Sequence, residues 1–234
     1  MAVVTSQNPF VVAEAPADER VHFIRLVYTH VAGAWLAFFL FECVILTLPI
    51  TYTFTRIVLT VPGGWLAVLG LFMGVGWLAR VFVTGGMSVR YQYLGLGLYV
   101  LAEAIVFAPL NIDTLWMAGP ALLLNAVLLS AALFAGLTAV VFTTKKDFSF
   151  LGSILTVAGC VSLGLIVGSI VFGFNLGLAF SAGMIAVAGG AILYDTSRIL
   201  RDHKPDEYVA AALELFASMA LLLWYVIRIL LAFG

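Results

Sequence analysis

Long apolar runs alternate with short polar breaks along this chain of 234 residues. A helix needs about 20 mainly apolar residues to cross the hydrocarbon core of a bilayer. Seven runs come close to or exceed that length, and they predict spans over residues 26–49, 64–84, 93–110, 116–142, 150–173, 176–197 and 208–232. The pattern therefore predicts an all-α, polytopic membrane protein built as a seven-transmembrane-helix bundle.

The residues ahead of the first run have a different character. Residues 1–22 hold proline, alanine and several acids, and they lack the basic start and short apolar core of a signal peptide. We expect them to form a flexible N-terminal tail, followed by one transmembrane domain over residues 23–234.

Basic residues in the connecting segments indicate the orientation of the bundle. Lysine and arginine gather in the loops that bound alternate spans, namely Arg20, Arg25, Arg90, Lys145, Lys146, Arg201 and Lys204. The other side has Arg56 and little else until Arg228. Because basic loops stay in the cytoplasm, we expect a cytoplasmic N-terminus and, after seven spans, a C-terminus outside.

Composition narrows the classes of partner. Hydrophobic residues make up 64% of the chain and charged residues only 10%, whereas soluble domains carry about 25% charged residues. The lipid bilayer is therefore the expected surrounding. A net charge of −1 offers no basic surface for nucleic acid, so we expect no such partner.

A few ionisable residues lie inside the expected spans. They are Glu42, Arg80, Glu103, Asp195 and Glu214, with Arg198 and Arg228 nearer span ends. A charge at the bilayer centre costs about 2.5–3.5 kcal/mol on insertion scales, so each should face the bundle interior or water. A structural ion pair is the simpler reading for Arg80 and Arg228, and it stays open for Glu42 and Glu103. For Asp195, in the inner half of the sixth span, we expect a function.

Clustered carboxylates suggest what that function is. Neighbouring carboxyl groups can share a proton and titrate as a coupled pair. Their oxygens also attract a hard cation such as calcium. The intramembrane acids therefore favour an ion path or a pH-sensitive latch, centred on Asp195.

The stretch ILYDTSRIL over 192–200 resembles the Bax inhibitor-1 family, also called the transmembrane Bax-inhibitor-motif proteins. The stretches at 23–33, 140–152 and 223–234 resemble the same family, so the resemblance covers nearly the whole chain from about residue 20. It implies a seven-helix bundle and, for bacterial members, a pH-sensitive calcium leak. In those members the aspartate that Asp195 matches pairs with a second aspartate in the last span, and an arginine, here matched weakly by Arg80, helps to hold the closed form.

This chain departs from that pattern in its last span. Ser218 stands where the second aspartate is expected, which is the pattern of a bacterial branch associated with an ATP-dependent membrane protease as a modulator. Glu214 lies four residues earlier, about one helical turn (5.4 Å) away on the same face. We therefore hypothesise that Asp195 and Glu214, with Arg80 or Arg198, form the polar centre and could hold calcium transiently. For Arg198, a local pair with Asp195 or Asp202 is the alternative.

Two functions remain open from the sequence. One is a calcium or other cation leak sensitive to pH, with no resident cofactor, in a bacterial inner membrane. The other is a non-conducting protein that binds a membrane protease or a stress-response partner. An enzyme is not expected, because residues 208–234 contain no aspartate for an aspartyl protease and the chain has no HExxH zinc motif.

Overall fold

The computed structural model describes residues 11–61, 63–84 and 88–233. Those residues form a short 3-10 helix η1 (Val12–Glu14) and eight α-helices, with no strand among them. The helices are α1 (Ala17–Ile45), α2 (Pro49–Thr60), α3 (Gly64–Thr84), α4 (Val89–Met117), α5 (Pro120–Thr144), α6 (Leu151–Phe172), α7 (Gly177–Arg201) and α8 (Tyr208–Phe233). Seven of them, all but α2, are long and apolar enough to cross a membrane. The chain is an all-helical integral membrane protein, as its sequence predicts.

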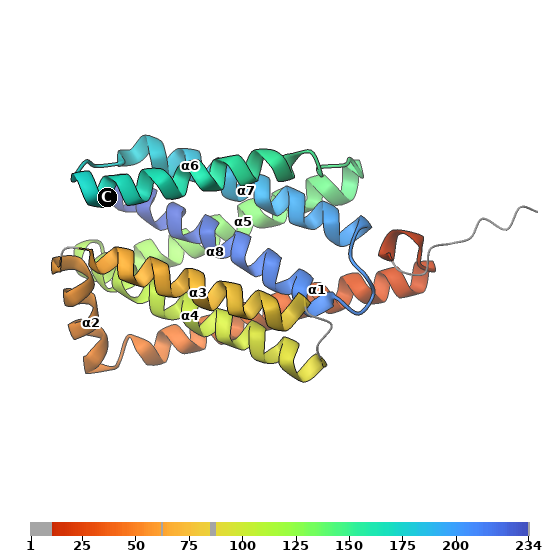
Figure 1. The fold of residues 1–234 in the computed structure, drawn as a ribbon, viewed down its shortest axis with the longest axis horizontal. Helices are drawn as coiled ribbons and strands as arrows, with labels where there is room; N and C mark the ends of the chain where they lie inside the picture. Colours follow the sequence, from red (N-terminus) through yellow and green to blue (C-terminus); the bar gives the residue numbers. More distant parts are fainter. Residues whose placement is uncertain (1–10, 62, 85–87, 234) are drawn as a thin grey trace, which may run out of the picture.

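Helix α8 runs through the middle of the bundle, and the other long helices surround it (Figure 1). In the most apolar stretch of α8, 50% of the residues are buried, compared with 56% in α4 and none in α6. Aromatic side chains fill the centre, where the rings of Phe38 and Phe107 meet edge to face at 5.2 Å and Trp35 lies 5.1 Å from Phe216. Helices α4 and α8 are therefore the most buried spans and form the core of the fold, while α6 lies at the periphery.

Several helix boundaries differ from those expected. The first span begins at Ala17 rather than near residue 26, and α4 runs from Val89 to Met117 where 93–110 was expected. Helix α4 continues through Pro109, because neighbouring helices let a membrane helix tolerate the missing hydrogen bond. The additional helix α2 has 12 residues, about 18 Å of helix, which is too short to span. It crosses the end of the bundle (Figure 1).

Part of the expected flexible tail has regular structure. Residues 1–10 lie outside the described residues, but η1 and the first turns of α1 occupy 12–22. Val12 is fully buried, and its N–H donates to the carbonyl of His203 at 2.8 Å. This contact joins the N-terminal segment to the turn between α7 and α8.

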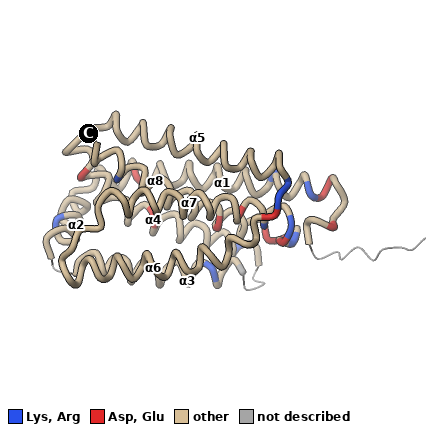
Figure 2. The backbone as a smooth tube through the Cα atoms, turned by 90° about the horizontal axis from the view of Figure 1, so that it is seen from above, with Lys and Arg blue, Asp and Glu red and all other residues tan. Residues whose placement is uncertain are grey.

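Charged residues gather mainly at one end of the bundle (Figure 2). This end, called the basic end below, carries the start of α1, the α5–α6 connection and the α7–α8 turn; the far end carries α2. The distribution follows the pattern from which a cytoplasmic N-terminus is expected. The orientation across the membrane itself stays a prediction.

Candidate functional site

Asp195 lies in the last third of α7, where that helix packs against α8. The hydroxyl of Ser218, on α8, donates a hydrogen bond to Asp195 Oδ2 at 2.5 Å. Both residues are buried, with 8% and 9% of their surface exposed. The residue expected to replace a second carboxylate therefore faces Asp195 directly, and it supplies a neutral donor instead of a charge.

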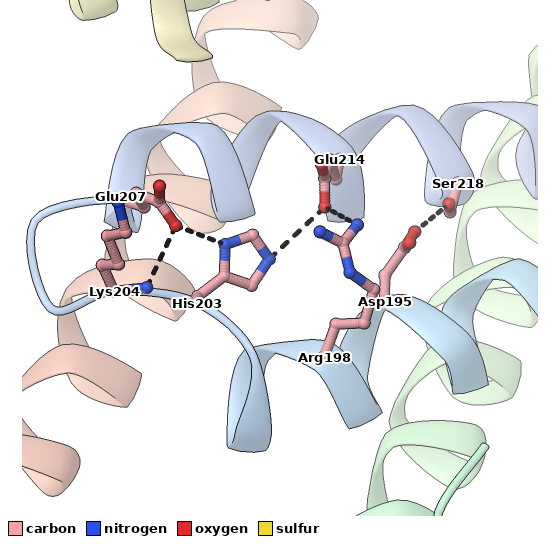
Figure 3. A network of polar contacts seen from close by, with 7 residues as sticks. All are labelled: Asp195, Arg198, His203, Lys204, Glu207, Glu214 and Ser218. Atoms are coloured by element: carbon pink, nitrogen blue, oxygen red, sulfur yellow. Dashed lines mark hydrogen bonds and ion pairs between the residues drawn. The ribbon is translucent and has the colours of Figure 1, made fainter. Parts of the chain in front are cut away.

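Arg198, one turn further along α7, pairs with Glu214 on α8. Its Nη1 lies 3.0 Å from Glu214 Oε2, and the side chains are 30% and 26% exposed. The guanidinium also lies over the Tyr194 ring, 5.6 Å from its centroid. Arg198 thus crosses to the neighbouring helix instead of forming the local ion pair with Asp195 or Asp202 that was the alternative. Glu214 lies close enough to Asp195 for their charges to interact, but its own contacts are with Arg198 and His203 (Figure 3).

Other residues of the same motif fasten α7 to its surroundings. The Tyr194 ring packs so closely on Gly152 of α6 that a Cβ there would lie 3.0 Å from it. Ser197 accepts a hydrogen bond from the N–H of Phe148 at 3.2 Å. Successive side chains of the motif therefore fix α7 to α8, to α6 and to the loop before α6.

That loop is also held by the end of α7. Arg201 donates to the carbonyl of Lys145 at 2.7 Å and pairs with Asp147 at 3.2 Å. Asp147 in turn accepts the N–H of Ser149 at 2.8 Å. Hydrogen bonds from Ser149, and secondarily the charge of Arg201, hold the pKa of Asp147 below its ordinary value.

His203 joins the site from the α7–α8 turn, and the sequence did not single it out. It is 3% exposed, with Nε2 3.4 Å from Glu214 Oε2 and Nδ1 3.5 Å from Glu207 Oε2. Glu207 also accepts the N–H of Lys204 at 3.0 Å (Figure 3). In the sequence, His203 is one residue of a charged stretch at 201–207. The conformation of the turn decides which of these side chains points inward, and the sequence does not reveal it.

A cavity of about 1230 Å³ connects these groups. It lies between α3 and α6, with α4, α7 and α8 lining it as well, and its wall includes Asp195, Arg198, Glu214 and Ser218. Its lining extends from Ser149 near the basic end to Arg228 near the far end, and so along the length of α6.

The intramembrane charged residues fall into two groups. Arg80 and Glu103 line the same cavity as Asp195, and both act electrostatically on Tyr99. Glu42 lies apart from it and faces Asn111 on α4. The intramembrane charges therefore consist of a cavity group and one separate carboxyl.

Asp195 and Glu214 offer carboxylate oxygens to a cation, but Ser218 and Arg198 already donate to them. Among the described residues, no three His, Cys, Asp or Glu side chains come together as metal ligands would. A calcium ion approaching Asp195 and Glu214 would compete with the hydroxyl of Ser218 and the guanidinium of Arg198. The oxygens of these two acids are therefore occupied by donors of the protein itself.

Comparison with known proteins gives a family match over most of the chain. The sequence model described as inhibitor of apoptosis-promoting Bax1 matches residues 20–234. Bax inhibitor 1 of Schizosaccharomyces pombe is 27% identical over 234 residues, covering 98% of this chain and 83% of that protein.

Bacterial relatives match shorter segments. The uncharacterized protein PA2604 of Pseudomonas aeruginosa is 36% identical over 102 residues, or 43% of this chain and 46% of its own. The modulator of FtsH protease YccA of Escherichia coli K12 is 37% identical over 92 residues, or 38% and 41%. These two matches span less than half the length of each bacterial relative.

Proposed function

Because the chain belongs to the Bax inhibitor-1 family, we propose that it is a cation leak of a bacterial inner membrane, with calcium as its cargo and no enzymatic activity. The observation that supports this most is the cavity that reaches Asp195. A pathway for cations needs a polar route with carboxylates along it. A buried aspartate in a membrane helix costs free energy, and a role on such a route explains why the chain has one.

The closed state in this proposal depends on two contacts between α7 and α8. Ser218 binds Asp195, and Arg198 binds Glu214. A positive guanidinium beside the cavity repels a cation while it also occupies the acid that would bind one. Release of Arg198 from Glu214 would let the guanidinium move away from the cavity and open the route to Asp195.

Protons act on this arrangement through Glu214. Once protonated, Glu214 no longer carries the charge that holds Arg198, so flux should increase as the pH falls. Ser218 has no charge to contribute, so the response differs from that of two facing carboxylates, which repel one another when both are ionised.

Calcium flux into liposomes tests the proposal. Wild-type protein should carry calcium above the rate of protein-free liposomes, Asp195→Asn should lower that rate, and Glu214→Gln should raise it by releasing Arg198. Glu19→Gln, an exposed residue of α1, is the matched control and should leave the rate unchanged. Equal rates for wild type and Asp195→Asn would refute the leak.

A second candidate is a modulator that binds a membrane protease. Its specific support is the similarity to YccA, which is named a modulator of FtsH protease. In that case the basic end, where η1 docks against the α7–α8 turn, is the side a cytoplasmic protease would meet. Crosslinking from exposed positions of the α5–α6 loop to the FtsH of the same bacterium, with an absence of calcium flux, would favour this candidate over the leak.

A further inference from the structure

A second buried carboxyl lies away from the cavity, near the far end of the bundle. Glu42 is on the last turn of α1, is 5% exposed, and faces Asn111 of α4, which is 7% exposed. One turn before each of them, Phe38 and Phe107 are in ring contact. Glu42 and Asn111 therefore form the next layer of the α1–α4 interface, above an aromatic layer.

Helix α2 closes this region from the far end. Thr51, at the start of α2, donates to the carbonyl of Ile45 at 2.6 Å, which fastens α2 to the end of α1. Thr51 and Thr55 are 4% and 1% exposed, so this face of α2 is turned into the protein. Glu42 is thus enclosed between aromatic rings on one side and the end formed by α2 on the other.

The hydrogen-bonding groups at this layer are mainly acceptors. Both carboxyl oxygens of Glu42 and the Oδ1 of Asn111 are inaccessible to solvent, and none has a well-formed hydrogen bond within the described residues. Among the described residues, Asn111 is the side chain that acts on the Glu42 carboxyl; the Thr55 hydroxyl on α2 is also buried without a hydrogen bond. Buried polar atoms in native proteins are nearly always paired, so three adjacent acceptors indicate a missing donor.

One proton supplies that donor. A protonated carboxyl donates from its O–H to Asn111 Oδ1, while the Asn111 amide N–H donates back to the other carboxyl oxygen. This acid–amide pair satisfies all three oxygens and needs no room for a metal ion or a water molecule. The two orientations of an amide differ only in which end is oxygen, so exchanging the two ends of the Asn111 amide can present its oxygen to the acid proton.

We propose that Glu42 and Asn111 form a proton-binding site, separate from the cavity around Asp195, in which Glu42 is a neutral acid hydrogen-bonded to Asn111. The site does not depend on the proposed leak. It makes Glu42 a store for one proton at the far end of the bundle, beneath α2.

Infrared spectroscopy of the purified protein in lipid nanodiscs tests this directly. Wild type at neutral pH should have a carbonyl stretching band of a protonated carboxyl that shifts in D₂O, and Glu42→Gln should remove one such band. Glu19→Gln on the same helix is the matched control and should leave the band in place. Persistence of the full band in Glu42→Gln would overturn the proposal.

Two further measurements keep the test decisive. Asn111→Leu should move the band to higher frequency, because the acid loses its acceptor; an unmoved band would show that no pair exists. Added sodium or calcium should change the unfolding temperature of wild type and of Glu42→Gln by the same amount. A cation-dependent rise in wild type that is absent in Glu42→Gln would mean that the site binds a metal ion instead of a proton.

Discussion

Replacing Ser218 with alanine isolates the contact that holds Asp195. The change removes one hydroxyl and leaves a carboxylate with 8% of its surface exposed without that donor. A hydrogen bond to a charged group contributes about 1.5–3 kcal/mol, and leaving a buried partner unsatisfied costs a similar amount. We expect Ser218→Ala to lower the free energy of unfolding by about 2 kcal/mol.

Ser162 provides a matched control for that measurement. It has the same 9% exposure as Ser218, but its hydroxyl donates to the sulfur of Met184 at 3.0 Å, a weak acceptor. Ser162→Ala should therefore cost less than about 1 kcal/mol. The assay is unfolding of detergent-solubilised protein by increasing sodium dodecyl sulfate, followed by circular dichroism.

A double-mutant cycle with Asp195→Asn completes the test. On the Asp195→Asn background, Ser218→Ala should cost only about 1 kcal/mol, since the acceptor is then neutral. The coupling between the two positions should therefore be about 1 kcal/mol. If Ser218→Ala is no worse than Ser162→Ala, or if the two changes are additive, Asp195 does not depend on Ser218 and the reasoning is wrong.

Three other predictions concern the basic end. Glu214→Gln leaves the half-buried Arg198 without its carboxylate and should lower the free energy of unfolding by about 1–2 kcal/mol, between the values for exposed and buried pairs. Adding Arg198→Gln should recover part of that loss. No recovery in the unfolding assay would count against the ion pair. Asp147, whose folded-state pKa is below the ordinary 3.8, stabilises the fold above that pH and loses this effect as the pH falls further. The unfolding temperature of Asp147→Asn should accordingly lie below wild type at neutral pH and converge with it in acid; a constant gap would contradict this. Lys145 caps the end of α5 at φ 52°, a left-handed conformation that favours glycine. Lys145→Gly should therefore stabilise the protein by about 1 kcal/mol. A lower unfolding temperature for this variant would show that the Lys145 backbone is not strained.

The spans were predictable because each is a long apolar run. The expected 64–84 and 208–232 differ from α3 and α8 by at most a residue at each end. The short helix α2 was not predicted, since its 12 residues are too few to span a bilayer and many of them are β-branched, which does not favour helix. The expected third span ended at residue 110, just after Pro109, but packing against neighbouring helices carries α4 past this proline.

The candidate site was predictable in part for a similar reason. The cost of a buried charge identified Asp195, and helical spacing placed Ser218 and Glu214 on one face of the last span. Spacing alone could not decide that Glu214 binds Arg198 instead of joining Asp195, because that depends on how α7 and α8 are rotated. His203 was missed because it enters from a turn, where no periodicity fixes the direction of a side chain.

Replacing Ser218 with aspartate tests the central claim. The claim is that the neutral Ser218 hydroxyl and the Arg198–Glu214 ion pair hold this cavity closed. The measurement is calcium flux into liposomes as a function of pH for wild type and Ser218→Asp. Wild-type flux should increase as the pH falls, because protonation of Glu214 releases Arg198. In Ser218→Asp a second component should increase as the pH rises, because two facing carboxylates repel once both are ionised. Identical pH profiles for the two proteins, or no flux from either, would contradict the account.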